Sequence, residues 1–265
     1  MADTLVDIAG AANAAIEDPA PAIDNPPPTD VKLIRGVLNT ANGEWETTAV
    51  VRELTGEDEE TLAALDSKGD LSYGDYLVAL LKRAVVSIGT QKVENNPEVL
   101  EDLIIGDRDL LFLAVIRATY GRVREIQMAC GSCGESNDVG IDLDEDFKVE
   151  GTPKDLTKPI QVQLKDGSTI SLNYPTTGDS RYASRKGKTT AEQNTLIISR
   201  CLVSEMDKDS RETWAKKLGL VDRKKITKAI NSAQPGPKME EVKTQCAHCD
   251  QELIVVLDWV SLLFG

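Results

Sequence analysis

Two short motifs decide the fold of this chain: CGSC at residues 130–133 and CAHC at residues 246–249. Each motif is followed by seven residues and then by an apolar residue and an aspartate, which are ID at 141–142 and LD at 257–258. The chain therefore contains one short unit twice. A C-x-x-C turn directs both of its sulfurs at one ion, and two such turns supply the four thiolates of a tetrahedral structural zinc site.

We expect the four cysteines of these motifs, Cys130, Cys133, Cys246 and Cys249, to bind one structural zinc ion per chain. A site with four protein ligands leaves no open coordination position, and a zinc enzyme needs one. The pattern thus predicts a clasp between distant parts of the chain and argues against zinc catalysis. Four unrelated free thiols are the alternative, but they would not explain the shared spacing.

His248 is the only histidine in the chain and lies inside the second motif. Because two cysteines flank it, we expect it to support the metal ligands from outside the coordination shell, or to be exposed, and not to replace a cysteine. A Ser-His-Asp or Cys-His site would have to take this residue out of the motif, so we expect no catalytic residues and no enzyme. Cys201 lies in an apolar run, where we expect a buried structural thiol.

The composition is that of a globular protein without an aromatic binding surface. Of the 265 residues, 41% are hydrophobic but only 4% are aromatic, so we expect a core of aliphatic side chains. The sequence shows no basic leader with an apolar core and no apolar stretch of about 18 residues, so we expect neither secretion nor a membrane span. Cysteines in C-x-x-C pairs fit a reducing cytoplasm better than disulfides. No P-loop or dinucleotide-binding glycine motif supports a small-molecule substrate.

The charge is distributed unevenly along the chain. The formal net charge is -14, and residues 1–60 hold thirteen acids against three bases, whereas residues 181–238 hold fourteen bases against six acids. The basic region fits either a solvated helical surface or the docking of an acidic partner. Binding of nucleic acid through this region is a further alternative, which the overall acidity disfavours.

The chain divides into four predicted parts of an α+β protein. Residues 1–30 combine an acidic, Ala-rich stretch with five prolines, so we expect a flexible arm. We expect a body of helices and a β-hairpin at 31–122, and a split zinc ribbon at 123–143 and 242–260. Residues 144–241 then form an inserted domain with its own hairpin and helices.

Alternation, capping and turn signals predict the elements within these parts. Predicted strands cover residues 31–34, 45–54, 123–128, 160–164, 169–172 and 242–244. Predicted helices cover residues 57–65, 76–88, 97–105, 109–120, 191–203, 210–218 and 222–232. We expect Asn42-Gly43 and Asp166-Gly167 to form hairpin turns. We expect Gly106-Asp107 to separate two helices and residues 178–188 to form a mobile loop.

The order of these segments resembles the family of tailed-phage baseplate proteins related to the T-even phage baseplate hub assembly protein. The segments that carry the resemblance are VVREL (50–54), TGEDEETLA (55–63), YLVALLKRAVVSIG (76–89), LIIGDRDLLFLAVIRATYG (103–121), CGSCGESNDVGIDL (130–143) and VKTQCAHCDQELIVVLD (242–258). GDRD at 106–109 and the paired cysteine motifs are the most specific. The first thirty residues show no resemblance.

The resemblance implies a non-enzymatic protein of the contractile-tail baseplate, which either assists assembly of the hub or remains beside it. Its partners would be other baseplate or tail-hub proteins, met in the host cytoplasm during assembly and, in the second case, retained in the virion tail. Only the four cysteines carry over, as metal ligands, and some family members lack part of this set. The alternative left open is a zinc-ribbon adaptor that binds nucleic acid through the basic insertion. We expect no membrane partner.

Overall fold

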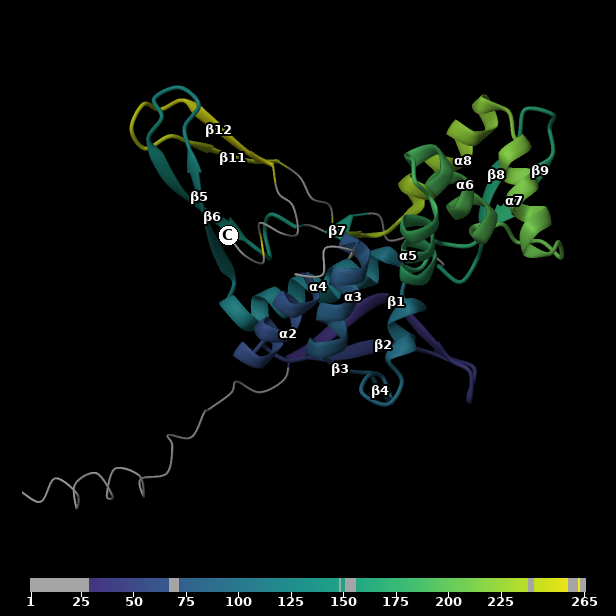
Figure 1. Cartoon of the computed structure of the whole chain (residues 1–265), viewed down its shortest axis with the longest axis horizontal. Helices are drawn as coiled ribbons and strands as arrows, with labels where there is room; N and C mark the ends of the chain where they lie inside the picture. The colour runs from purple at the N-terminus through teal and green to yellow at the C-terminus, as the bar shows by residue number, and fades with distance from the viewer. Residues whose placement is uncertain are drawn as a thin grey trace, which may run out of the picture.

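Figure 1 shows the computed structural model, which describes residues 29–66, 72–147, 149–150, 156–237, 241–256 and 262. The protein has a mixed α+β fold, as predicted, with seven α-helices and five small antiparallel sheets in the described part. The predicted arm lies outside the described residues except for Thr29 and Asp30, which belong to the first strand. Within the described ranges, no helix is long and apolar enough to cross a membrane.

A four-stranded antiparallel sheet and three α-helices form the N-terminal body, residues 29–120 (Figure 1). Its strands are β1 (Thr29–Asn39), β2 (Glu44–Val51), β3 (Val85–Ile88) and β4 (Gln91–Lys92), paired in that order. Its helices are α2 (Gly56–Asp66), α3 (Tyr73–Ala84), the 3-10 helix η1 (Pro97–Glu101) and α4 (Ile105–Tyr120). The buried core between sheet and helices is mostly aliphatic, as the composition predicts.

Asp107, in the first turn of α4, holds the irregular middle of β1. Its carboxylate accepts hydrogen bonds from the backbone N–H groups of Ile34, Arg35 and Gly36, at 2.6, 3.1 and 2.8 Å. The ladder between β1 and β2 changes register at this point, so these N–H groups have a side-chain acceptor in place of a neighbouring strand. The contact fixes α4 on the sheet.

Two boundaries in the body differ from those predicted. Gly106 and Asp107 do not separate two helices, because α4 begins at Ile105 and includes both residues. An acidic residue in the first turn stabilises a helix, and the strand satisfies the carboxylate. The predicted helix at 76–88 ends at Ala84, and residues 85–88 form β3, since VVSI contains three β-branched residues and its Val85, Ser87 and Ile88 pair with β2.

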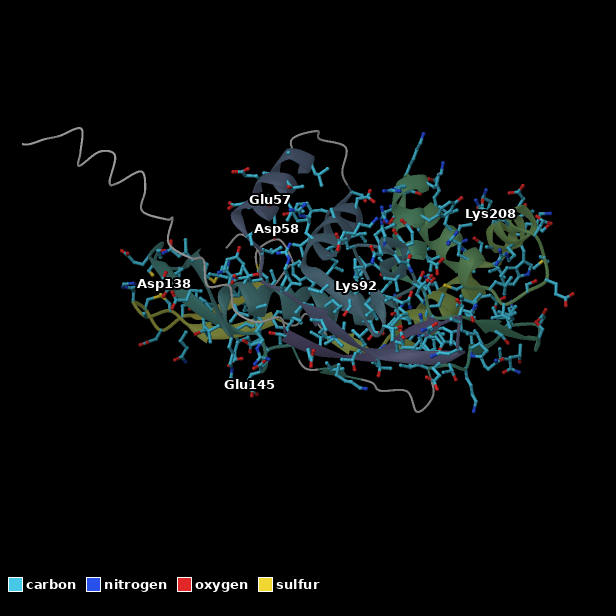
Figure 2. The ribbon with its side chains drawn as sticks, turned by 90° about the horizontal axis from the view of Figure 1, so that it is seen from below. Glu57, Asp58, Lys92, Asp138, Glu145 and Lys208 are labelled. Atoms are coloured by element: carbon cyan, nitrogen blue, oxygen red, sulfur yellow. The ribbon has the colours of Figure 1, made fainter. Side chains whose placement is uncertain are left out.

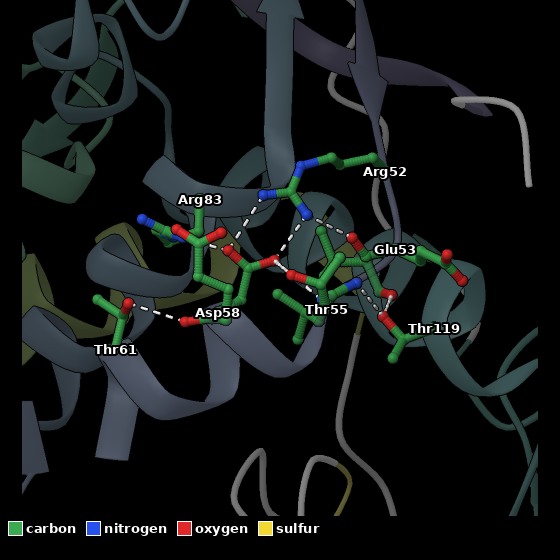
Figure 3. Close-up of polar contacts among 10 residues, drawn as sticks. Arg52, Glu53, Thr55, Asp58, Thr61, Arg83 and Thr119 are labelled. Atoms are coloured by element: carbon green, nitrogen blue, oxygen red, sulfur yellow. Dashed lines mark hydrogen bonds and ion pairs between the residues drawn. The ribbon is translucent and has the colours of Figure 1, made fainter. Parts of the chain in front are cut away.

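A second buried carboxylate, Asp58, joins α2 to the sheet and to α3 (Figure 3). It accepts hydrogen bonds from Arg52 at 2.6 and 3.1 Å and from Arg83 at 2.6 Å, and the backbone N–H of Thr55 donates to it at 2.9 Å. Burial raises the pKa of Asp58, but these donors outweigh it and hold the pKa well below its ordinary value. The cluster locks the N-terminus of α2 in place.

The basic insertion, within residues 144–241, contains a β-hairpin and four helices. Its elements are β8 (Ile160–Gln163), β9 (Thr169–Leu172), α5 (Thr177–Lys186), α6 (Thr190–Cys201), α7 (Lys208–Lys217) and α8 (Leu220–Ala233). Its aliphatic cluster is separate from that of the body and includes Cys201, whose thiol is fully buried. Burial raises the pKa of that thiol above its ordinary value.

Residues 178–188 are not a loop, because α5 covers most of them. Thr176 and Asp179 form a reciprocal capping box at its N-terminus, in which each side chain accepts a hydrogen bond from the backbone N–H of the other. The sequence TTGD supplies the Ser/Thr and acid of this motif three residues apart. The signal was present in the sequence, but the polar composition of the segment obscured it.

The insertion meets the body at the start of α4. Two short strands, β7 (Val149–Glu150) and β10 (Gly236–Pro237), pair beside this helix. The backbone of Pro235 and Gly236 packs directly against Gly106. A Cβ on Gly106 would be 1.8 Å from the carbonyl oxygen of Pro235. Arg181 of α5 forms ion pairs with Asp75 of α3 and Glu101 of η1. The domain boundaries at 122/123, 143/144 and 241/242 stay predictions.

The two ends of the molecule differ in what they carry. In both Figure 1 and Figure 2, the hairpins with the cysteine motifs lie at one end and the basic insertion lies at the opposite end. Figure 2 shows Asp138 at the first end and Lys208 at the second. The cysteines and the basic surface are therefore separate features of the molecule.

Candidate metal centre

Two β-hairpins present the cysteine motifs side by side at one end of the molecule (Figure 1). The first consists of β5 (Val123–Ala129) and β6 (Ser136–Asp142), and the second of β11 (Glu241–Gln245) and β12 (Glu252–Val256). We call them the cysteine hairpins. In each, the last strand pair directly precedes the motif, namely Ala129 with Ser136 and Gln245 with Glu252. The repeated sequence thus folds as a repeated structure.

Both motifs have the same backbone conformation. The N–H of Cys130 donates to the carbonyl of Glu135, and the N–H of Gly134 donates to the carbonyl of Cys130. Cys246 makes the corresponding bonds with Gln251 and Asp250. The residue after each second cysteine has positive φ, 77° at Gly134 and 56° at Asp250, as this tight turn requires.

The sulfurs of the four cysteines form one compact group. All four ligand atoms lie within 4.8 Å of one another. The Sγ atoms of Cys130 and Cys249 are 3.7 Å apart, and so are those of Cys133 and Cys246. Four sulfurs around zinc at about 2.3 Å are separated by about 3.8 Å. These residues therefore fit a tetrahedral metal ion, and no other such group of His, Cys, Asp or Glu occurs in the described residues.

Backbone N–H groups favour the thiolate of the first cysteine in each motif. The N–H groups of Cys133 and Ser132 lower the pKa of Cys130. The N–H of His248, 3.4 Å from the sulfur of Cys246, lowers the pKa of that thiol to about 6. Thiolates are the form that binds metal, so the loop conformation prepares two of the four ligands.

The second cysteine of each motif shows the opposite shift. The N–H of Glu135 lowers the pKa of Cys133, but desolvation and the neighbouring thiols outweigh it and raise the pKa to about 12. At Cys249 the N–H of Gln251 likewise lowers the pKa, but burial and the thiols of Cys130 and Cys246 produce a net increase. Four sulfurs this close cannot all ionise without a compensating cation. A bound cation would favour the thiolate form of all four cysteines.

Asn137 links the two motifs directly. Its side-chain oxygen accepts a hydrogen bond from the backbone N–H of Ala247 at 2.9 Å, and its amide nitrogen donates to the carbonyl of Glu135 at 3.0 Å. The repeat places Leu253 at the corresponding position of the second hairpin, where it forms a buried apolar cluster with Cys130 and Cys246. Sequence reasoning missed Asn137, although a polar residue opposite an apolar one in the repeat was a usable signal.

The remaining predicted features have clear positions. The side chain of His248 is exposed on the second motif, and only its backbone N–H contacts a cysteine sulfur. Asp142 ends β6 and binds Arg122 at 2.7 Å. Its counterpart at 257–258 lies outside the described residues. Cys201 lies in the insertion and takes no part in the cysteine cluster.

Comparison with known proteins gives one match. No curated protein and no solved structure is significantly similar to this chain. The family model described as T4 bacteriophage base plate protein matches residues 40–265, which include both cysteine motifs and the basic insertion. This match covers most of the sequence and confirms the resemblance given by the order of the segments. The chain therefore belongs to the family of T4 bacteriophage base plate proteins.

Proposed function

We propose that this protein is a structural or assembly component of the phage baseplate hub that acts through contacts with other tail proteins and carries out no catalysis. A structural zinc ion holds its two cysteine hairpins together. The family match supports a baseplate protein, and the close grouping of four cysteine sulfurs is the observation that carries the zinc clasp. With all four positions taken by protein ligands, the ion would be structural.

In this proposal the clasp defines the parts of the molecule. Residues 31–122 are the body, 123–143 with 242–260 are the zinc ribbon, and 144–241 form the inserted domain. The ion would join two hairpins that are far apart in the sequence, since Cys133 and Cys246 are separated by 113 positions. Closing so long a loop costs chain entropy, and binding of the ion would offset this cost. The inserted domain and the body would then be held as surfaces for partner proteins.

Metal analysis of the purified full chain tests the clasp. Protein made under reducing, zinc-replete conditions is expected to hold about one zinc ion per chain. Cys249→Ser should lose most of the zinc because it removes one ligand. Cys201→Ala is the matched control, since its thiol is outside the cluster, and should keep the metal. Absence of zinc from the unmodified protein would sink the clasp.

Capture of partners tests the role in the baseplate. A tagged chain expressed during infection is expected to retain other baseplate or hub proteins, and mass spectrometry of finished virions shows whether it stays in the tail. Retention in virions identifies a lasting component, and loss after capture from infected cells identifies an assembly factor. Failure to capture any tail protein from infected cells contradicts the proposal.

A further inference from the structure

The first turn of α8 carries the most exposed large hydrophobic side chains of the described chain. Leu220 is 75% exposed and Val221 is 65% exposed. Two shallow grooves lie beside this turn, and Ala191, Leu220 and Arg223 line both of them. We call the turn and its two grooves the α8 surface. Exposed aliphatic side chains next to concave surface are typical of a site that receives another segment of protein.

The α8 surface is also rich in cations without acidic partners. Lys224 and Lys228 line the first groove, and Lys186 and Lys216 line the second. None of these lysines takes part in an ion pair with a described residue. Two acids, Glu192 and Glu212, line the second groove as well. The surface still has an excess of positive charge.

Arg223 adds a further positive charge at the centre of the surface. Its guanidinium donates to the hydroxyl of Thr195 at 2.8 Å and to the carbonyls of Ala191 and Ala215 at 2.9 and 3.0 Å. All three acceptors are neutral, so the hydrogen bonds fix the side chain between α6, α7 and α8 without cancelling its charge. A carboxylate from a docked segment would complement this charge.

We propose that residues 1–28 of this chain dock on the α8 surface. Five carboxylates lie in this segment, at Asp3, Asp7, Glu17, Asp18 and Asp24, and it contains no lysine or arginine. It also has aliphatic residues beside these acids, as in LVDI at 5–8 and AIED at 15–18. Both kinds of side chain that would complement the surface, acidic and aliphatic, are therefore present in one segment, and charge complementarity guides such docking.

The surface fits an acidic peptide better than a nucleic acid. Its two exposed aliphatic side chains offer nothing to a phosphate backbone, and the two acids that line its second groove repel one. Tyr182 is the only aromatic residue that lines either groove, whereas single-stranded nucleic acid is usually held by several stacking rings. Leu220 and Val221 can instead be covered by the aliphatic residues of the acidic segment.

The inference rests on the proposed function, because it gives that protein-contact role one specific contact. Zero-length carbodiimide cross-linking of the purified full chain tests it by joining a carboxylate to a lysine in an ion pair. Peptide mapping is expected to find acids of residues 1–28 joined to Lys186, Lys216, Lys224 and Lys228. Mixing isotope-labelled and unlabelled chains shows whether the segment belongs to the same or a second copy, and either product supports the docking.

Charge reversal supplies the controls. The double variant Lys224→Glu, Lys228→Glu should lower cross-linking at the remaining Lys186 and Lys216 about tenfold. Adding Glu17→Lys and Asp18→Lys should restore the contact with reversed charges. Lys92→Glu, an exposed change on β4, is the matched control and should leave cross-linking unchanged (Figure 2).

Three outcomes overturn the docking. The first is the absence of cross-links from residues 1–28 to this surface, and the second is cross-linking that the double charge reversal leaves unchanged. The third is binding of duplex DNA at physiological salt that the charge reversal abolishes, in a protein that forms no such cross-links. The last assigns the surface to nucleic acid. If cross-linking fails while capture of tail proteins persists, the docking inference falls and the proposed function stands.

Discussion

Asp58 shows how much of this fold depends on single buried side chains. It has no exposed surface, while its partners Arg52 and Arg83 keep about a third of their side chains exposed. Water therefore does not reach the carboxylate, although it does reach the two guanidinium groups. Removing it should leave the N–H of Thr55 and both cations without their acceptor.

Asp58→Ala is expected to lower the free energy of unfolding by about 2–3 kcal/mol, less than for a fully buried pair because both arginines are partly exposed. Urea denaturation monitored by circular dichroism measures the change. Glu60→Gln, exposed on the same helix, is the matched control and should be nearly neutral. An Asp58→Ala protein as stable as the control would contradict the role of the cluster.

The same cluster predicts a pH dependence. Because the pKa of Asp58 is lower in the folded protein than in the unfolded chain, its contribution is full above about pH 4 and is lost as the pH falls below that value. Asp75 acts in the same direction. Burial raises its pKa, but donors such as Arg185 outweigh burial and lower the pKa to about 2. The difference in free energy of unfolding between the unmodified protein and Asp58→Ala should therefore become smaller below about pH 4.

The sequence predicted which four cysteines come together but not the polar contacts that hold distant segments of the chain in place. The spacing of the cysteines identified all four sulfurs that meet in the structure. Asn137 and Asp107 were missed, because each accepts backbone N–H groups from a segment more than 70 residues away. Such contacts depend on tertiary placement, which local patterns do not encode. Local capping, as at Thr176, was accessible in principle.

Among the helices and strands, errors occurred where local propensity competes with tertiary pairing. Both predicted hairpins with Asn-Gly and Asp-Gly turns are present, because positive φ at Gly43 and Gly167 is a local requirement. Helix α3 ends early because β2 offers a partner to residues 85–88. The short pair β7 and β10 had no sequence signal at all, since each strand has only two residues.

The contact of α4 with β10 is the element junction most sensitive to a small change. Gly106→Ala is expected to lower the free energy of unfolding by about 1–3 kcal/mol, because its Cβ would overlap the Pro235 carbonyl in the backbone. Gly56→Ala, with nothing within 4 Å of its Cβ, is the matched control. Hydrogen exchange should show faster exchange at the amides of β7 and of Gly236 in the first variant alone. Unchanged exchange there would show that the junction is not tightly packed.

For the molecule as a whole, the cysteine hairpins are held in two different ways along their length. Near the body, Val139, Ile141 and Val255 belong to the main aliphatic core. At the tip, the apolar cluster consists only of Cys130, Cys246 and Leu253, with Met128 partly buried against it. So small a cluster buries little apolar surface, so the tip should depend on the bound ion much more than the base does.

Removal of metal should therefore unfold the hairpin tips and leave the rest of the protein folded. After chelation under reducing conditions, hydrogen exchange is expected to accelerate most at residues 128–137 and 244–253. Helices α3 and α4 should keep their protection, because the body has an aliphatic core of its own. Zinc added back should restore the protection of the tips, whereas magnesium, which prefers oxygen ligands, should not. Equal protection of the tips with and without metal would mean that the hydrogen bond of Asn137 and the small apolar cluster are sufficient to hold the hairpins together.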